Sequence, residues 1–427
     1  MHQYIINKSF LSGELSIPPS KSHTLRALLF GALAEGKSIV RHYLHSSDTM
    51  RMIDACRLLG ATVEVFPDKI EIKGISGVIP PLQGIIDAGN SGIILRFLTA
   101  ICALSTGEVK VTGDSSICSN RPMNSLLQAL TMLGAKIHFL GKQGYAPFTI
   151  QGPLKGGKVT VDGADSQPVS ALLIAAAFAA KPIEIKVTRP GEIPYIQMTL
   201  KWLDDLNIPY EKEGYELFRL KGSARPSGFD YTVPGDLSTA AFPLAAALIT
   251  KSELLIKNID LNDSQGDKEL VEVFMKMGAI FEVDSLLKTI KVKKSVSLRG
   301  LTLDINNYID ALPILAVVGC FASGETHLLN ASNARHKECD RIRAIKEELG
   351  RMGASIVEKR DGLLVKHSQL KPGTLNSHQD HRIAMALSVA AMGVNGETTL
   401  SPIDCVAKTY AHFAKDFIAL GANFKTQ

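Results

Sequence analysis

Two kinds of helical pattern alternate along the chain. One kind is rich in alanine and leucine and apolar on nearly every side, and the other is amphipathic and ends at a Leu-Gly-Ala or Met-Gly-Ala sequence. A helix that is hydrophobic all round is buried, whereas an amphipathic helix covers a core with one face. Alternating apolar and polar residues follow each helix and predict strands. The pattern therefore predicts α/β modules with one buried and one exposed helix each.

The residue that ends each amphipathic helix recurs at a regular interval. Glycine or asparagine suits this position because the backbone there takes a left-handed conformation. The spacing of about 70 residues predicts six repeats. The recurring residues are Gly60, Gly134, Asn207, Gly278, Gly353 and Gly421.

Repeats of this length exceed those of ordinary solenoids, so we expect two closed domains of three repeats each. A stretch rich in glycine, proline and serine at 222–235 predicts the crossing between the domains. The segment before residue 19 belongs to no repeat and is expected to pair with strands of the last repeats. The predicted domains are residues 1–18 with 234–427, and residues 19–233.

Composition narrows the class of function. The chain has 427 residues, a net charge of +5 and six cysteines without C-x-x-C spacing. The charge is too small for a nucleic-acid-binding surface, and the apolar runs of about ten residues are too short to cross a membrane. No Gly-rich P-loop, Ser-His-Asp arrangement or H-E-x-x-H motif occurs, so we expect neither a metal nor a nucleotide cofactor. These features predict a cytoplasmic protein.

Basic residues stand near many of the predicted helix starts. A cation there is unfavourable because the helix dipole is positive at that end. Serine, aspartate and asparagine at such positions, including Asp236 and Ser238, have an alternative explanation as N-caps. The cations do not, and they predict a site for phosphate or carboxylate ligands. These residues are Lys21, Arg26, Arg96, Arg121, Arg341, Arg382 and Lys408.

Two carboxylates add proton-transfer chemistry to this predicted anion site. Asp310 is expected to head an apolar helix, and Glu338 lies between Lys337 and Arg341 in the sequence RHKECDRI. Carboxylates among cations can move protons, with pKa values set by their neighbours. His381 either takes part or orients its neighbours.

The helix-start motifs resemble those of the 5-enolpyruvylshikimate-3-phosphate synthase family over nearly the whole chain. The resemblance implies two domains of three βαβαββ-type units each and an active site in the interdomain cleft. It also implies transfer of the enolpyruvyl group of phosphoenolpyruvate to the 5-hydroxyl of shikimate 3-phosphate by a monomer without metal or organic cofactor. The matching segments include PPSKSHTLRAL, GNSGIILRFL, NRPMNSLLQAL, SQPVSALL, VPGDLSTAAF, ARHKECDRI, DHRIAMAL and AKTY.

The same resemblance implies roles for individual residues. Asp310 would accept the hydroxyl proton, and Glu338 with Lys21 would handle protonation of the methylene carbon. Phosphoenolpyruvate would be bound by Lys21, Gly92, Arg121, Gln167, Arg341, Arg382 and Lys408. Shikimate 3-phosphate would be bound by Lys21, Ser22, Arg26, Asp165, Ser166, Gln167, Tyr195, Asp310, Asn333 and Lys337.

Two positions depart from the family pattern. Asp165 and Glu192 stand where the family commonly has serines that contact the 3-phosphate, and a carboxylate there would repel a phosphate. A relative acting on a modified shikimate is therefore one alternative. A second alternative is the enolpyruvyl transferase of UDP-N-acetylglucosamine, but Ser116 stands where that family has a catalytic cysteine, and Cys118 is misplaced. A third is a non-catalytic binder of a phosphorylated ligand, for which Asp310 and Glu338 would have no use.

Overall fold

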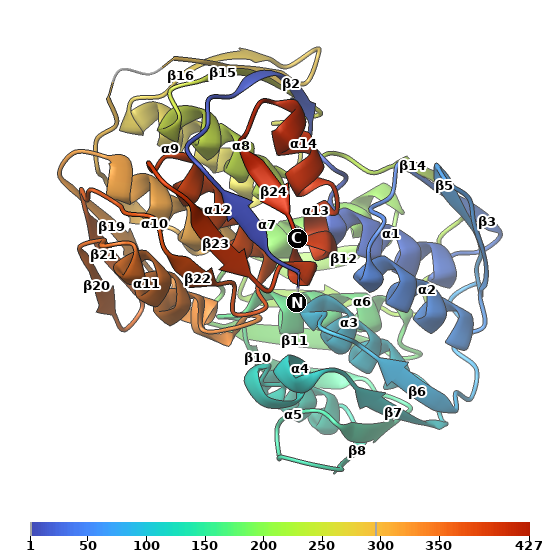
Figure 1. The fold of residues 1–427 in the computed structure, drawn as a ribbon. Coiled ribbons are helices and arrows are strands. Elements are labelled where there is room, and N and C mark those ends of the chain that lie inside the picture. Colours follow the sequence, from blue (N-terminus) through green and yellow to red (C-terminus); the bar gives the residue numbers. More distant parts are fainter. Residues whose placement is uncertain (1, 295–296) are drawn as a thin grey trace. The chain divides into compact units, whose positions relative to one another are not determined.

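The computed structural model describes residues 2–294 and 297–427 (Figure 1). The chain divides into two compact units, which we call unit 1 (Met1–Pro18 with Pro234–Gln427) and unit 2 (Pro19–Val233). Within the described residues, no helix combines the length and apolarity needed to span a membrane. The described residues form six four-stranded sheets, three in each unit.

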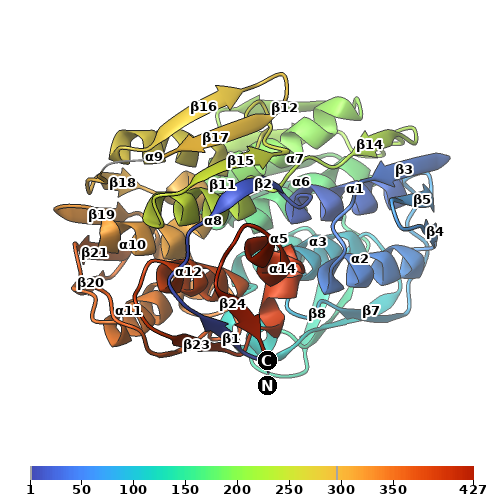
Figure 2. The ribbon, with the colours of Figure 1, turned by 45° about the horizontal axis from the view of Figure 1, so that its top comes forward.

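Unit 2 carries its three sheets with helices packed against them. Its helices are α1 (Lys21–Leu33), α2 (Ser47–Leu58), α3 (Gly92–Cys102), α4 (Ser115–Asn120), α5 (Asn124–Met132), α6 (Ser166–Phe178) and α7 (Ile193–Asp205). Its strands are β3 (Lys37–Arg41), β4 (Thr62–Val65), β5 (Lys69–Lys73), β6 (Gly84–Asp87), β7 (Glu108–Thr112), β8 (Lys136–Phe139), β9 (Phe148–Gln151), β10 (Gly157–Asp162), β11 (Ile183–Thr188), β12 (Tyr210–Glu213), β13 (Leu217–Leu220) and β14 (Asp230–Thr232). Figure 2 shows β3, β4 and β5 along the outer side of α1 and α2.

Unit 1 is built in the same way, with 3₁₀ turns (η) before some helices. Its helical segments are α8 (Leu237–Ile249), η1 (Gly266–Lys268), α9 (Glu269–Met277), η2 (Asn306–Ala311), α10 (Leu312–Phe321), η3 (Ser332–His336), α11 (Arg341–Arg351), α12 (His381–Met392), η4 (Asp404–Val406), α13 (Ala407–Tyr410) and α14 (Phe413–Ala419). Its strands are β1 (Tyr4–Ile6), β2 (Ser12–Ser16), β15 (Glu253–Lys257), β16 (Ile280–Asp284), β17 (Thr289–Lys293), β18 (Thr302–Asp304), β19 (Glu325–Leu329), β20 (Ile356–Lys359), β21 (Gly362–Lys366), β22 (Thr374–Asn376), β23 (Thr398–Ser401) and β24 (Phe424–Thr426).

All six sheets share one arrangement, in which one edge strand pairs parallel with its neighbour and the other two pairs are antiparallel. In the order β6-β7-β9-β8, the first two strands are parallel, because α3 connects them, and the remaining pairs are antiparallel. The sheets β10-β11-β13-β12 and β18-β19-β21-β20 repeat this order. The predicted α/β fold with βαβαββ-type units is confirmed.

Three of the six sheets are completed by a strand from elsewhere in the sequence. β14 follows the third repeat but pairs with β3 of the first, and β2 pairs with β15 of the fourth. β1 lies between β23 and β24 of the sixth repeat (Figure 2). The backbones of Gln3 and Gln427 exchange hydrogen bonds of 2.8 and 3.0 Å there. The chain is therefore not six self-contained repeats.

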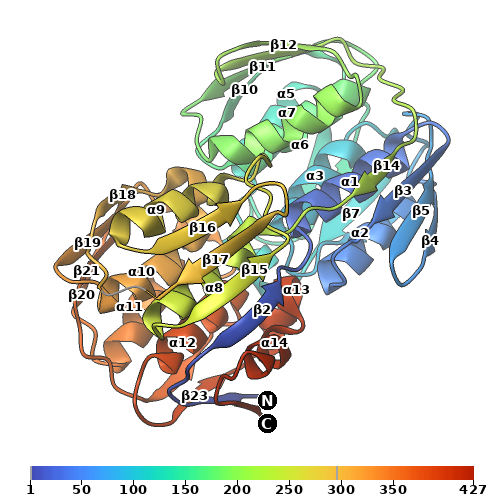
Figure 3. The ribbon, with the colours of Figure 1, turned by 90° about the horizontal axis from the view of Figure 1, so that it is seen from above.

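The apolar helices form the cores of the two units. Every residue of α8 is buried, and α8 packs against α10 and α12 inside unit 1 (Figure 3). In unit 2, α3 and α6 pack together in the same way. The hydrophobic effect places these helices inside, because none of them has a polar face to turn toward water.

Two predicted helix starts differ from those observed, and one predicted helix is divided into two. α10 begins at Leu312, after a 3₁₀ turn that contains Asp310, because Pro313 suits the first turn of a helix. α5 begins at Asn124, and the short helix α4, capped by Asp114, precedes it. The last amphipathic helix is divided into α13 and α14.

Candidate active site

Polar side chains gather at helix starts in both units. In unit 1 they form a group that we call the Arg341 cluster, which consists of Asp310, Glu338, Arg341, Asp380, Arg382 and Lys408. In unit 2 they form the Ser166 cluster, which consists of Gly92, Arg96, Arg121, Asp165, Ser166, Gln167 and Glu192.

Arg341 is the centre of its cluster. Its Nε lies 2.7 Å from Asp380 Oδ2, its Nη2 lies 2.7 Å from Glu338 Oε2, and its Nη1 lies 2.6 Å from Asp310 Oδ1. Arg341 is the first residue of α11 and is 1% exposed. A buried cation at a helix start is unfavourable on two grounds, desolvation and the helix dipole. The three carboxylates offset both.

Two further cations complete the Arg341 cluster. Arg382 Nη2 lies 2.9 Å from Asp310 Oδ2, and Lys408 Nζ lies 2.7 Å from Glu338 Oε1. The formal charges of the three carboxylates and three cations cancel. Carboxylates of the chain itself thus supply countercharge to these three cations, and the site for phosphate or carboxylate ligands stays a prediction.

The neighbours of Asp310 control its protonation. Burial alone would raise the pKa of Asp310, but the charges of Arg382, Arg341 and Lys337 outweigh it and hold the pKa well below its usual range. Burial likewise opposes the charge of Arg341, yet Asp380, Glu338 and Asp310 raise its pKa well above the usual value. Asp310 is thus a carboxylate that holds no proton as long as the two arginines stay beside it.

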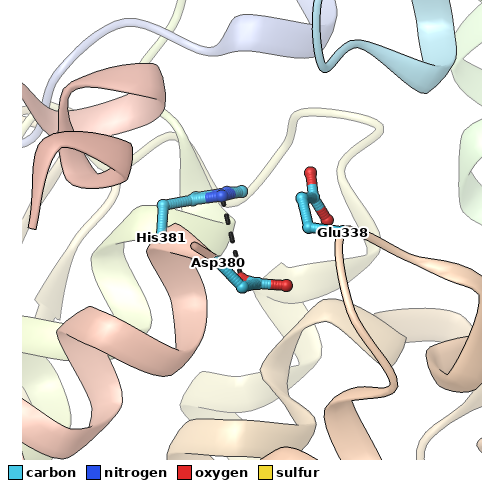
Figure 4. Close-up of side chains that lie close together, drawn as sticks. All are labelled: Glu338, Asp380 and His381. Carbon is cyan, nitrogen blue, oxygen red and sulfur yellow. Dashed lines mark ion pairs between the residues drawn. The ribbon is translucent and has the colours of Figure 1, made fainter. Parts of the chain in front are cut away.

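Glu338, Asp380 and His381 also form the one grouping of possible metal ligands among the described residues, with ligand atoms within 4.8 Å of one another (Figure 4). His381 Nδ1 lies 3.8 Å from Asp380 Oδ1. However, Glu338 and Asp380 already accept hydrogen bonds from Arg341. A metal ion would have to displace that guanidinium, so the grouping fits Arg341 as its cation.

In the Ser166 cluster, Arg96 balances Asp165. Asp165 is the N-cap of α6 and accepts a hydrogen bond from Gln167 N at 3.0 Å. Arg96 Nη2 lies 3.1 Å from Asp165 Oδ2, and Arg96 Nη1 donates to Gln167 Oε1 at 2.9 Å. The carboxylate expected to repel a phosphate thus has an arginine partner.

Gly92 lies where three of these side chains converge. A Cβ atom at Gly92 would stand 2.9 Å from Arg96 Nη1, 3.0 Å from Gln167 Oε1 and 3.3 Å from Arg121 Nη1. The first two separations are too short for an ordinary contact, so a side chain here would push polar groups apart. The glycine lets them approach the start of α3.

Glu192, the second departure from the family pattern, contacts Ser166. Ser166 Oγ donates to Glu192 Oε2 at 2.8 Å, and the backbone N–H of Ser166 points to the same oxygen at 3.4 Å. Both residues are 1% exposed. The start of α6 is therefore already in contact with a carboxylate.

At the start of α1, Arg26 is held by neutral oxygens. Its Nε donates to Thr199 Oγ1 at 3.1 Å, and its Nη2 donates to the Tyr195 carbonyl at 3.3 Å. Its Nη1 donates to the Ser22 carbonyl at 3.2 Å. Burial lowers the pKa of Arg26 to about 9, which leaves it charged at neutral pH. Lys21, the first residue of this helix, has Nζ 3.9 Å from Asp48 Oδ2.

The sequence did not single out every member of these clusters. Asp380 begins the helix-start motif DHRIAMAL, but the motif does not predict Arg341 as its partner, and the sequence does not predict that Arg96 contacts Gln167. A carboxylate partner stabilises a buried cation, and a search for such partners would have identified Asp380. Asn333 lies in η3 and Lys337 just after it, close enough for the charge of Lys337 to act on Asp310.

Asp267 is a further buried carboxylate in unit 1. It lies in η1, where it accepts a hydrogen bond from Ser238 Oγ at 2.6 Å. Burial raises its pKa to about 7. The positive charge of Arg382 lowers the pKa, and the negative charge of Asp310 raises it. In the unfolded chain an aspartate loses its proton near pH 4. Between about pH 4 and pH 7 the folded protein therefore holds a proton that the unfolded chain has lost, and this contribution to stability declines as pH rises.

We expect Asp267→Asn to remove that decline, because asparagine stays neutral and can still accept from Ser238. The melting temperature of the variant relative to the unmodified protein should rise by about 3–5 °C between pH 5 and pH 8. Thermal unfolding followed by circular dichroism measures this difference. Asp284→Asn, at an exposed carboxylate of β16, is the control and should show no such trend. A difference that stays constant with pH would contradict the prediction.

Comparisons with known proteins identify the family that the chain matches. Residues 6–417 match the family model described as EPSP synthase (3-phosphoshikimate 1-carboxyvinyltransferase). The chain is similar to the 3-phosphoshikimate 1-carboxyvinyltransferase of Chlamydia pneumoniae, with 45% identity covering 97% of this chain and 93% of the relative. The enzyme of the same name from Acetivibrio thermocellus is 41% identical, with 99% of each chain covered. The solved EPSP synthase from Acinetobacter baumannii superposes with a TM-score of 0.82 at 26% identity, and all of both chains is covered.

Proposed function

Because the chain belongs to the EPSP synthase family, it is a transferase that moves the enolpyruvyl group of phosphoenolpyruvate to shikimate 3-phosphate, and we propose that the two clusters described above carry out this reaction. The observation that supports the proposal is the Arg341 cluster. Two carboxylates suited to proton transfer are bound there to the cations that would attract phosphoenolpyruvate.

Phosphoenolpyruvate competes with the cluster's own carboxylates. Its phosphate and carboxylate groups form strong charge-assisted hydrogen bonds with guanidinium and ammonium groups. When Arg341, Arg382 and Lys408 turn toward the ligand, Asp310 loses the arginine charges that hold its pKa down, and Glu338 loses its ion pairs with Arg341 and Lys408. Binding of the substrate thereby releases both carboxylates from their cations, so that they can exchange protons with the reactants.

Each proton then has an assigned place. Asp310 accepts the proton of the 5-hydroxyl as its oxygen bonds to C2 of phosphoenolpyruvate, and Glu338 with Lys21 delivers a proton to the C3 methylene. Glu338 then takes a proton back from C3 as the bond between C2 and the phosphate breaks, which leaves the enolpyruvyl ether and inorganic phosphate. Gly92, Arg121 and Gln167 would help to bind phosphoenolpyruvate.

The acceptor would be bound mainly by the starts of α1 and α6. Among the described residues, the oxygens to which Arg26 donates are neutral, and a carboxylate on the shikimate ring is a stronger acceptor than any of these. The remaining contacts would come from Lys21, Ser22, Asp165, Ser166, Gln167, Tyr195, Asp310, Asn333 and Lys337.

We also propose that the enzyme is a cytoplasmic monomer that binds neither nucleic acid nor membrane. Support comes from the small net charge of +5 and from the six cysteines, all of which are free thiols. Light scattering in solution should then give the mass of one chain, 46.1 kDa.

One assay tests the proposed function against its alternatives. The protein is incubated with phosphoenolpyruvate and one acceptor, and phosphate release is followed. We expect turnover with shikimate 3-phosphate and none with UDP-N-acetylglucosamine. Faster turnover with unphosphorylated shikimate would favour the modified-acceptor alternative that Asp165 and Glu192 raise. Absence of turnover with every acceptor would favour a binding protein.

A further inference from the structure

Glu192 is bonded to a group that the proposed function assigns to the 3-phosphate of the acceptor. We propose that the carboxylate of Glu192 occupies this phosphate subsite when no acceptor is bound. The phosphate group of shikimate 3-phosphate displaces the carboxylate, but free inorganic phosphate does not. The inference rests on the proposed function, because it takes Ser166 as a ligand of the 3-phosphate.

The contacts of Glu192 are those that a bound anion would make. One carboxylate oxygen of Glu192 accepts from the hydroxyl of Ser166 at 2.8 Å and faces the first N–H of α6 at 3.4 Å. A hydroxyl and a backbone N–H at a helix start are typical donors to phosphate. Because Ser166 has a single hydroxyl proton, a phosphate and Glu192 cannot both receive it.

Arg96 adds positive charge to the same place. It is 2% exposed, and its Nε has no hydrogen-bond partner among the described residues. Burial lowers the pKa of Arg96, as does the charge of Arg121, whereas the negative charges of Asp165 and Glu192 oppose this shift, so both carboxylates act electrostatically on Arg96. A phosphate carries about two negative charges at neutral pH and a carboxylate carries one, so the phosphate gains more from Arg96.

The backbone of Glu192 has an unfavourable conformation. Its φ of 47° and ψ of 43° are left-handed, and Arg189, three residues earlier, has a φ of 53°. Such angles are unfavourable for residues other than glycine and persist only when surrounding contacts impose them. Arg189 also forms an exposed ion pair with Asp162. Loss of the bond to Ser166 would release part of this strain.

Glu192 discriminates between ligands by the contacts that each ligand makes outside the phosphate subsite. Inorganic phosphate, a product of the reaction, contacts only the subsite itself, so only these contacts can favour displacement of Glu192. Shikimate 3-phosphate adds the contacts of its ring and carboxylate to the same displacement. Every anion must supply the free energy that displaces Glu192 from Ser166, and the additional contacts of the acceptor supply it. Specificity for the acceptor arises from this difference.

The test compares ligand binding by the unmodified protein and Glu192→Gln, without phosphoenolpyruvate. Glutamine keeps the size of the side chain but removes its charge. We expect about ten-fold tighter binding of shikimate 3-phosphate and about ten-fold stronger competition by inorganic phosphate, since one repelling charge is lost. Binding of unphosphorylated shikimate should stay within about two-fold. Glu192→Ser should change the same constants in the same directions.

The control is Glu184→Gln. Glu184 is a carboxylate near the other end of β11, paired with Lys158 and Arg219, and its replacement should alter none of the three constants. Weaker binding of shikimate 3-phosphate by Glu192→Gln, or an equal shift for all three ligands, would overturn the inference, because Glu192 would then be a substrate contact or a structural support. Turnover of shikimate 3-phosphate by the unmodified protein tests the proposed function separately.

Discussion

Replacement of Asp310 by asparagine is expected to lower kcat by about 10³-fold while shikimate 3-phosphate still binds. The expected loss is that of a general base, typically 10²- to 10⁴-fold. Binding should persist because Asp310 is one of many groups proposed to contact the acceptor. Asparagine also keeps an oxygen that can accept from Arg341 and Arg382, so the cluster keeps its shape.

Steady-state kinetics together with calorimetric titration of shikimate 3-phosphate separates this role from a structural one. Asp304→Asn is the matched control, because Asp304 is an exposed aspartate six residues earlier that caps the turn at Asn306. Loss of binding and of stability in Asp310→Asn, with full activity in the fraction that folds, would make Asp310 a structural residue.

Replacement of Arg341 by alanine is expected to lower the free energy of unfolding by about 4 kcal/mol near pH 8 and to abolish activity. Removal of one partner from a buried ion pair typically costs 3–5 kcal/mol, because the other charge stays buried without compensation. Here three carboxylates lose the same cation, and Asp380 is fully buried. Loss of activity follows from the role proposed for Arg341 in binding phosphoenolpyruvate.

The destabilisation should depend on pH. In the unmodified protein, Arg382 and Arg341 hold the pKa of Asp310 below its unfolded value, so its contribution to stability is present above about pH 4 and is lost as pH falls. In Arg341→Ala, Asp310 loses one of the two arginines that hold its pKa down, so protons can neutralise it at a higher pH. The difference between the two proteins should therefore narrow from pH 8 toward pH 5.

Urea denaturation at several pH values measures this difference. Arg343→Ala is the control, since Arg343 lies two residues along α11 and is exposed, and its removal should cost less than about 0.5 kcal/mol. Equal destabilisation by both substitutions, or a difference that does not change with pH, would mean that the carboxylates do not depend on Arg341 for their charge.

The local features of the fold were predictable from the sequence. Gly60, Gly134, Asn207, Gly278, Gly353 and Gly421 all have positive φ angles, between 53° and 114°. Each helix end was predictable because few residues adopt that conformation without strain. The family resemblance, which rested on helix-start motifs, is likewise confirmed.

What the sequence could not supply are the partners of long-range contacts. The pairing of β14 with β3, and of β2 with β15, links segments far apart in the chain, and an alternating pattern predicts a strand without its neighbour. The same limit applies to side chains. Arg341 and Asp380 are 39 residues apart, and only the packing of α11 and α12 brings them together.

The exchange of strands also sets an order of events during synthesis. Unit 2 is one continuous segment and can complete its sheets once β14 has left the ribosome. β1 is made before unit 2, whereas its partners β23 and β24 are made after it. At 5–20 residues per second, this strand waits roughly 20 to 80 s for its neighbours. At three residues, β1 offers a short edge to other nascent chains during that wait.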